Sequence, residues 1–246
     1  MAYLLEICSF NLQSAMIAQE AGAYRVELCA DPGDGGTTPS AGIIRVAREK
    51  LHIQLYPIIR PRGGDFLYSA EEYDSMIKDI AYCKEAGCDG VVIGLLNQDG
   101  SVDKKRTAKL VELAYPLGVT FHRAFDRAAN PFEALESIIE TGCERILTSG
   151  QRPTAMEGAG LINELIRQAD ERIVIMPGSG IRSSNILQLA ERTEAVEFHT
   201  SARRLVESGM QYVNGSMFES LTSVIADRQD IDGMLEKLKT IEPHSY

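Results

Sequence analysis

A short unit recurs along this chain and restricts its fold more than any other feature. Glu20-Ala21-Gly22-Ala23, Glu85-Ala86-Gly87-Cys88 and Glu140-Thr141-Gly142-Cys143 each end a predicted helix and stand directly before a predicted strand. Gly is favoured there because the residue after a helix C-terminus often takes a positive φ. Helices and strands that alternate in this way are typical of a parallel α/β sheet.

Eight segments with buried-strand character can be counted along the chain. They are Leu4–Cys8, Tyr24–Cys29, Ile53–Arg60, Asp89–Gly94, Val119–Arg123, Arg145–Ser149, Arg172–Met176 and Ala195–Thr200. Predicted helices lie between them, at Leu12–Ala21, Ala41–Lys50, Ala70–Ala86, Asp103–Tyr115, Pro131–Thr141, Gly158–Gln168 and Ser183–Ala190. This alternation predicts a (β/α)8, or TIM, barrel, with a doubly wound open sheet as the alternative.

The chain has 246 residues, and no Gly/Ser linker or change in composition marks a second domain. We therefore expect a single domain over residues 1–246, with the barrel at about 3–204. A less regular tail, 205–246, is predicted to carry one last helix around Ile231–Ile241.

Charge and composition exclude several classes of protein. Twenty-five Lys and Arg against 35 Asp and Glu give a net charge of -10, which argues against nucleic-acid and anionic-membrane partners. No apolar run is long enough for a transmembrane helix, and the N-terminus lacks the basic region of a signal peptide. We expect a cytoplasmic protein whose five cysteines are free thiols.

The strands alternate between apolar residues, which should face the helices, and polar residues, which should face the barrel interior. Five strands place charged or polar groups inside, among them Glu6, Cys8, Arg25, Glu27, Cys29, Arg60, His122, Glu197 and His199. A structural core would carry Val, Ile and Leu at these positions, because buried charges are costly unless paired. Since barrel enzymes keep their active sites at the C-terminal ends of the strands, these residues predict a functional site there.

Several motifs together resemble the CutC family, which is named for copper homeostasis. They are LEIC, RVELC, GGTTPS, IIRPRGGDF, TFHRAFD, ILTSG, PGSGI and EFHTSAR, and they extend over about residues 3–204. The resemblance implies a cytoplasmic TIM-barrel protein, often a homodimer, that binds or handles copper. It also implies that Cu(I) is held by the cysteines that end the first two strands, Cys8 and Cys29.

The chemistry of these residues is compatible with that expectation. Cu(I) is a soft ion that prefers thiolate ligands, and Cys8 and Cys29 end adjacent strands with the same inward parity. The alternative is that both are ordinary buried cysteines, as we expect for Cys83, Cys88 and Cys143.

A second hypothesis is an enzyme that acts by acid/base chemistry on a small anionic or phosphorylated metabolite. Glu27, His122 and Glu197 are the catalytic candidates. The ligand-binding candidates are Glu6, Arg60, Arg62, Arg123 and His199, with Gly178, Gly180 and Ser201 in Gly-rich turns that could bind phosphate. A self-neutralising network of internal salt bridges is the structural alternative. No GK[ST] motif follows the Gly-rich loop Asp31–Pro39, so we expect no nucleotide cofactor.

Overall fold

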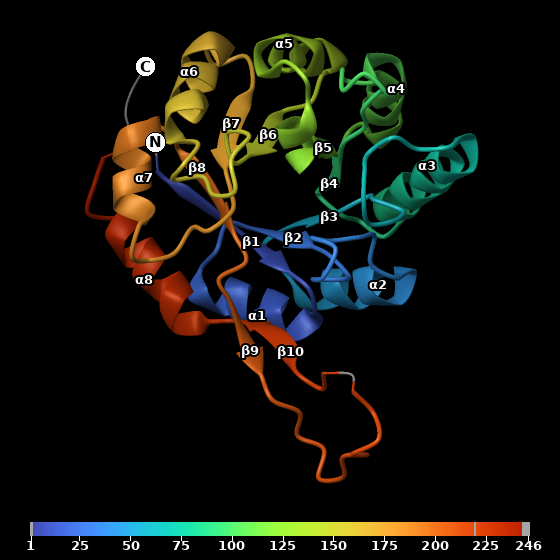
Figure 1. The fold of residues 1–246 in the computed structure, drawn as a ribbon, viewed down its shortest axis with the longest axis vertical. Helices are drawn as coiled ribbons and strands as arrows, with labels where there is room; N and C mark the ends of the chain where they lie inside the picture. The colour runs from blue at the N-terminus through green and yellow to red at the C-terminus, as the bar shows by residue number, and fades with distance from the viewer. Residues whose placement is uncertain (1, 219, 243–246) are drawn as a thin grey trace.

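A computed structural model of the chain describes residues 2–218 and 220–242. Parallel strands form a ring with helices outside it, which is the predicted (β/α)8 barrel (Figure 1). The strands of the ring are β1 (Leu4–Ser9), β2 (Arg25–Leu28), β3 (Gln54–Pro57), β4 (Gly90–Ile93), β5 (Gly118–Phe121), β6 (Arg145–Thr148), β7 (Val174–Pro177) and β8 (Glu197–Thr200). The helices are α1 (Leu12–Ala21), α2 (Ala41–Lys50), α3 (Ala70–Glu85), α4 (Lys104–Ala114), α5 (Pro131–Thr141), α6 (Ala159–Ala169), α7 (Ile186–Thr193) and α8 (Arg228–Leu238), with a 3-10 turn η1 (Arg123–Arg127) after β5.

The ring closes from two parallel runs of strands. One run has the order β3-β2-β1-β8 and the other β4-β5-β6-β7. They join where the Ile59 N–H donates to the Val92 carbonyl at 2.8 Å, and where β7 lies beside β8. Pairing of β1 with β8 excludes the open-sheet alternative, because a closed ring leaves no free edge in the barrel.

The ends of the helices follow the predicted signals. Gly22 and Gly142 cap α1 and α5 with φ of 91° and 84°, in the left-handed region that favours glycine. Ser69 and Glu72 form a capping box at the start of α3, and Asn130 caps α5 ahead of Pro131.

Two helices begin three residues away from the predicted position. α7 starts at Ile186 and not at Ser183, because the Ser183 N–H donates to Asp230 Oδ1 instead of opening the helix. α8 starts at Arg228, three residues before the predicted tail helix, because the Asp227 side chain accepts from the Gln229 N–H and caps it there.

The predicted alternation of inward and outward residues is confirmed. Leu5 and Val26 are fully buried in the core between the ring and the helices. Glu6 lies beside Arg25, and Cys8 beside Glu27, in the parallel register of β1 and β2. This register brings both pairs to the barrel interior at two different heights.

The tail contains an arm that the sequence did not predict. β9 (Arg203–Val206) pairs antiparallel with β10 (Ser223–Ala226), and the chain between them extends away from the barrel (Figure 1). Apolar side chains are exposed on it, among them Tyr212 at 73% and Phe218 at 98%. Residues 243–246 of the predicted tail lie outside the described residues. None of the described helices combines the length and apolar character needed to span a membrane.

Candidate functional site

The lower part of the barrel interior holds an ion-pair network, formed by Glu6, Arg25, Arg145 and Glu197. Arg25 bridges Glu6 and Glu197 from β2, and its Nη2 lies 2.7 Å from Glu197 Oε2. Arg145 Nε contacts the same oxygen at 2.7 Å. Burial alone would raise the pKa of Glu6, but the charges of Arg25 and His199 and the hydrogen bonds with them together outweigh it and hold this pKa well below the usual value. We call these four residues the lower layer.

Two thiols and a carboxylate meet one step nearer the C-terminal ends of the strands. Cys8 Sγ and Cys29 Sγ are 3.6 Å apart, and ligand atoms of Cys8, Glu27 and Cys29 all lie within 4.8 Å of one another. The hydrogen bond with Cys29 lowers the pKa of Cys8 to about 5 against the effect of burial. Burial raises the pKa of Cys29 and of Glu27 well above their usual values, and charge on Cys8 adds to both shifts. Cys8 is thus the thiol that ionises first.

His199 on β8 connects the thiols with the lower layer. Its Nδ1 lies 2.6 Å from Glu6 Oε1, and its Nε2 lies 3.8 Å from Glu27 Oε2. Burial alone would lower the pKa of His199, but hydrogen bonds with Cys8 and Glu6 outweigh it and raise this pKa well above the usual value. The fold therefore favours the protonated form of His199 between Cys8 and Glu6. We call Cys8, Glu27, Cys29 and His199 the upper layer.

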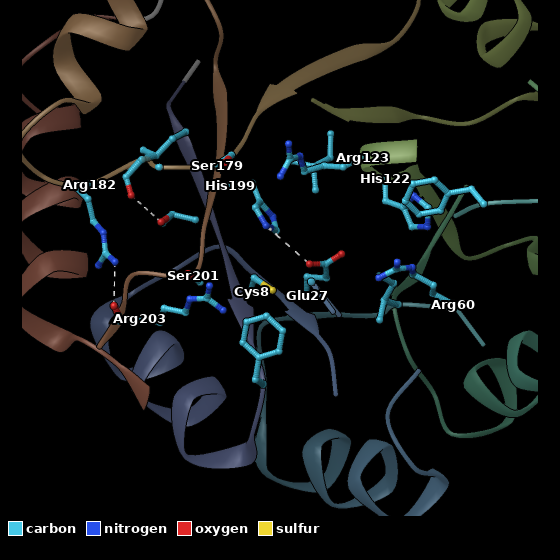
Figure 2. Close-up of a pocket in the computed structure, with 18 residues that line it drawn as sticks. Cys8, Glu27, Arg60, His122, Arg123, Ser179, Arg182, His199, Ser201 and Arg203 are labelled. Atoms are coloured by element: carbon cyan, nitrogen blue, oxygen red, sulfur yellow. Dashed lines mark hydrogen bonds and ion pairs between the residues drawn. The ribbon is translucent and has the colours of Figure 1, made fainter. Parts of the chain in front are cut away.

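A cavity of about 370 Å³ opens above this upper layer, at the C-terminal ends of the strands (Figure 2). Predicted site residues that line it are Cys8, Glu27, Arg60, His122, Arg123, Gly180, His199 and Ser201. Glu6, Cys29 and Glu197 do not line it. The volume is that of a pocket for a small molecule, larger than a metal ion requires.

Comparison with known proteins identifies the family. The CutC family model matches residues 3–204. The chain belongs to the CutC family. A CutC family protein of Chromobacterium violaceum is 54% identical over 214 residues, which cover 87% of each chain. The copper homeostasis protein cutC homolog of Homo sapiens is 46% identical over 215 residues, 87% of this chain and 79% of the human one.

Solved structures agree with this assignment. A crystal structure of CutC from Streptococcus agalactiae matches with a TM-score of 0.77 at 32% identity, over 81% of this chain and 98% of that one. Phosphoribosylanthranilate isomerase of Thermotoga maritima matches with a TM-score of 0.62 at 14% identity, over 98% of this chain and 100% of that one. The second likeness shows the barrel fold alone.

Of the three arginines predicted to bind a ligand, Arg123 lines the cavity, whereas Arg60 and Arg62 have other main contacts in this CutC barrel. Arg60 is buried and donates to the carbonyls of Asp34, Gly36 and Gly64 at 2.6, 2.8 and 3.0 Å, so it ties two loops together at the rim. Its Nε has no partner within the described residues. Arg62 does not line the cavity; it pairs with Glu72 and Asp65 on the outer surface.

His122 is buried at the cavity wall in a neutral form. Its Nδ1 accepts the Ala124 N–H at 3.1 Å, and its Nε2 has no partner within the described residues. Burial and the charge of Arg60 lower the pKa of His122 to about 3. The imidazole ring of His122 fits here because residue 94 is glycine: a Cβ on Gly94 would stand 2.3 Å from the ring.

In the Gly-rich turn after β7, one residue packs against the barrel and the next two line the cavity. Gly178 serves packing: its N–H donates to Thr148 O at 2.9 Å, and a Cβ there would stand 2.5 Å from Leu147. Ser179, with a φ of 84°, and Gly180 line the cavity.

Further lining residues were not expected from the sequence: Phe10, Ser179, Arg182 and Arg203. Arg203 ends the EFHTSAR motif two residues after Ser201, and this position was the available signal for it. Cys83, Cys88 and Cys143 are confirmed as packing residues of the hydrophobic core.

Proposed function

We propose that this CutC family protein takes part in copper homeostasis and binds Cu(I) through Cys8 and Cys29. The observation that carries the proposal is the pair of buried thiols, 3.6 Å apart, below a cavity that gives access from solvent. The names of its mouse and human relatives, copper homeostasis protein cutC homolog, point to the same metal.

The donor set suits a soft metal ion. Thiolates are preferred ligands of Cu(I), whereas the carboxylate of Glu27 is a hard donor. A metal-binding cysteine must lose its proton, and Cys8 is already the more acidic thiol of the pair. Glu27 lies beside the thiols, and the positive charge that is favoured on His199 would stabilise the thiolates that metal binding requires. All five cysteines are free, as a reducing cytoplasm would keep them.

An anaerobic Cu(I) titration against a chromophoric competing chelator tests this proposal. We expect one tight site per chain in the wild type. Cys8→Ala with Cys29→Ala should weaken it by more than about a hundredfold, since even changes outside the ligand shell weaken metal sites by up to this factor. Cys83→Ala with Cys88→Ala is the matched control, because these cysteines form a second interacting thiol pair that lies in the core.

Equal affinities of the two double variants would refute the assignment. Glu27→Gln tests whether Glu27 is a copper ligand or only lies beside the ligands. We expect less than about a tenfold change in Cu(I) affinity, because the amide keeps the shape of the side chain and the two sulfur ligands remain. A loss as large as that of the double cysteine variant would make Glu27 a ligand.

A further inference from the structure

The cavity above the thiols carries more positive charge than Cu(I) binding requires. Its wall includes Arg60, Arg123, Arg182 and Arg203 but only one acidic residue, Glu27, in a chain whose net charge is -10. Asp126 pairs with Arg123, and Asp230 with Arg182. Neither Arg60 nor Arg203 has a carboxylate partner within the described residues. A cavity lined by positively charged side chains favours an anionic ligand over a cation.

Hydrogen-bond donors without partners lie on two sides of this cavity. On the side of β3 and β5 are Arg60 Nε and His122 Nε2, whose residues are 94% and 96% buried, since 6% and 4% of them are exposed. Because His122 Nδ1 accepts a hydrogen bond, the neutral ring carries its proton on Nε2, and this atom is a donor. Buried donors that lack a partner are rare and costly, which indicates a ligand that brings acceptor oxygens.

The other side is formed by the turns after β7 and β8. The N–H groups of Gly180 and Ser201 donate no hydrogen bond within residues 2–218 and 220–242, and both residues line the cavity. Arg203 lies on the same side (Figure 2), and within the described residues its guanidinium group donates one hydrogen bond, from Nη1 to Pro32 O at 3.2 Å. Its Nε and Nη2 remain free for a ligand in the described structure. Backbone N–H groups beside an arginine form a suitable site for a phosphate group, and turns after the seventh and eighth strands often bind one in such barrels.

We propose that the cavity binds a small organic phosphate, with the phosphate at Gly180, Ser201 and Arg203 and an oxygen of its organic part at His122 Nε2. A volume of about 370 Å³ exceeds the size of a phosphate ion and leaves room for an organic part. This site is separate from the Cu(I) proposal, since it uses neither Cys8 nor Cys29.

Isothermal titration calorimetry of the metal-free chain tests the proposal, with inorganic phosphate, glycerol 3-phosphate, ribose 5-phosphate and phosphoenolpyruvate as probes. We expect inorganic phosphate to bind and at least one of the esters to bind more tightly. Arg203→Gln should weaken all of them by about tenfold or more, the loss of one charge-assisted hydrogen bond. Arg204→Gln is the matched control: it removes the same charge from the neighbouring residue, which does not line the cavity.

His122→Asn tests the second contact. Asn can keep the cap on the Ala124 N–H but lacks the buried Nε2 donor. We expect it to abolish the advantage of the ester over inorganic phosphate and to leave phosphate affinity unchanged; His122→Gln replaces it if Asn prevents folding. The Cys8→Ala and Cys29→Ala variant should bind phosphate like the wild type, so failure of the copper site and failure of this site remain distinguishable. Absence of phosphate binding, or equal losses in Arg203→Gln and Arg204→Gln, would overturn the proposal.

Discussion

The lower and upper layers of the barrel interior both contain buried glutamates, but the partners of these glutamates differ. In the lower layer, Arg25 and Arg145 both reach Glu197, and Arg25 also pairs with Glu6. In the upper layer, Glu27 has no ion pair closer than 3.8 Å among residues 2–218 and 220–242, and the layer borders the cavity. The charged side chains of the lower layer are thus paired with one another, whereas the polar groups of the upper layer remain available to a ligand in the cavity.

This difference indicates which buried polar groups hold the structure and which serve a ligand. A buried charge with matched partners is part of the folded framework, whereas a buried thiol or donor beside a cavity can bind something from outside. Glu197, a catalytic candidate in the sequence, lies in the framework by this criterion, and Glu27 does not.

The largest expected effect comes from breaking the lower layer. Glu197→Gln leaves Arg25 and Arg145 without their shared carboxylate, and we expect unfolding to become easier by about 3–5 kcal/mol. Glu27→Gln is the matched substitution in the upper layer, and it should cost less than about 1 kcal/mol because no close ion pair is lost. Urea denaturation of the metal-free proteins measures both. Equal losses would remove the distinction between the layers.

A smaller effect should appear in the pH dependence of stability. The pKa of His122 is about 3 in the folded chain, against an ordinary 6.5. Between these values the unfolded chain binds a proton that the folded chain does not, so the stability is present above about pH 6.5 and is lost as the pH falls toward 3. His122→Asn should reduce this slope by about 1 kcal/mol per pH unit. A slope unchanged by this substitution would contradict the neutral, buried His122.

The smallest effect is expected from a single hydrogen bond at the edge of the lower layer. The Tyr56 hydroxyl donates to Glu144 Oε1 at 2.9 Å, and Glu144 can be hydrated when that bond is lost. Tyr56→Phe should therefore cost about 1 kcal/mol in thermal or urea unfolding and leave the Cu(I) affinity unchanged. A marked loss of Cu(I) affinity in this variant would show that the layers are coupled.

Much of the fold was predictable from the sequence. The helix–Gly–strand units and the alternation of apolar residues predicted the barrel and the inward position of Glu6, Cys8, Glu27 and His199. These features depend on local backbone preferences and on a strand period of two, which one sequence displays directly.

The pairing of inward residues was not predictable, because it depends on strand register and side-chain length. Arg60 was expected to bind an anion, yet most of its guanidinium group holds loop carbonyls. The antiparallel β9 and β10 form a contact across residues 207–222, for which the chain shows no hairpin signal. The expected homodimer and the expected single domain over residues 1–246 stay predictions.

X-ray absorption spectroscopy of the Cu(I)-loaded protein tests the central claim most directly. With one copper per chain, we predict two sulfur scatterers in the first shell of the wild type and one in Cys29→Ala. The Cys83→Ala and Cys88→Ala control should keep both. A first shell of nitrogen and oxygen alone, or a sulfur shell that persists when Cys8 and Cys29 are both replaced, would contradict Cu(I) binding by the upper layer.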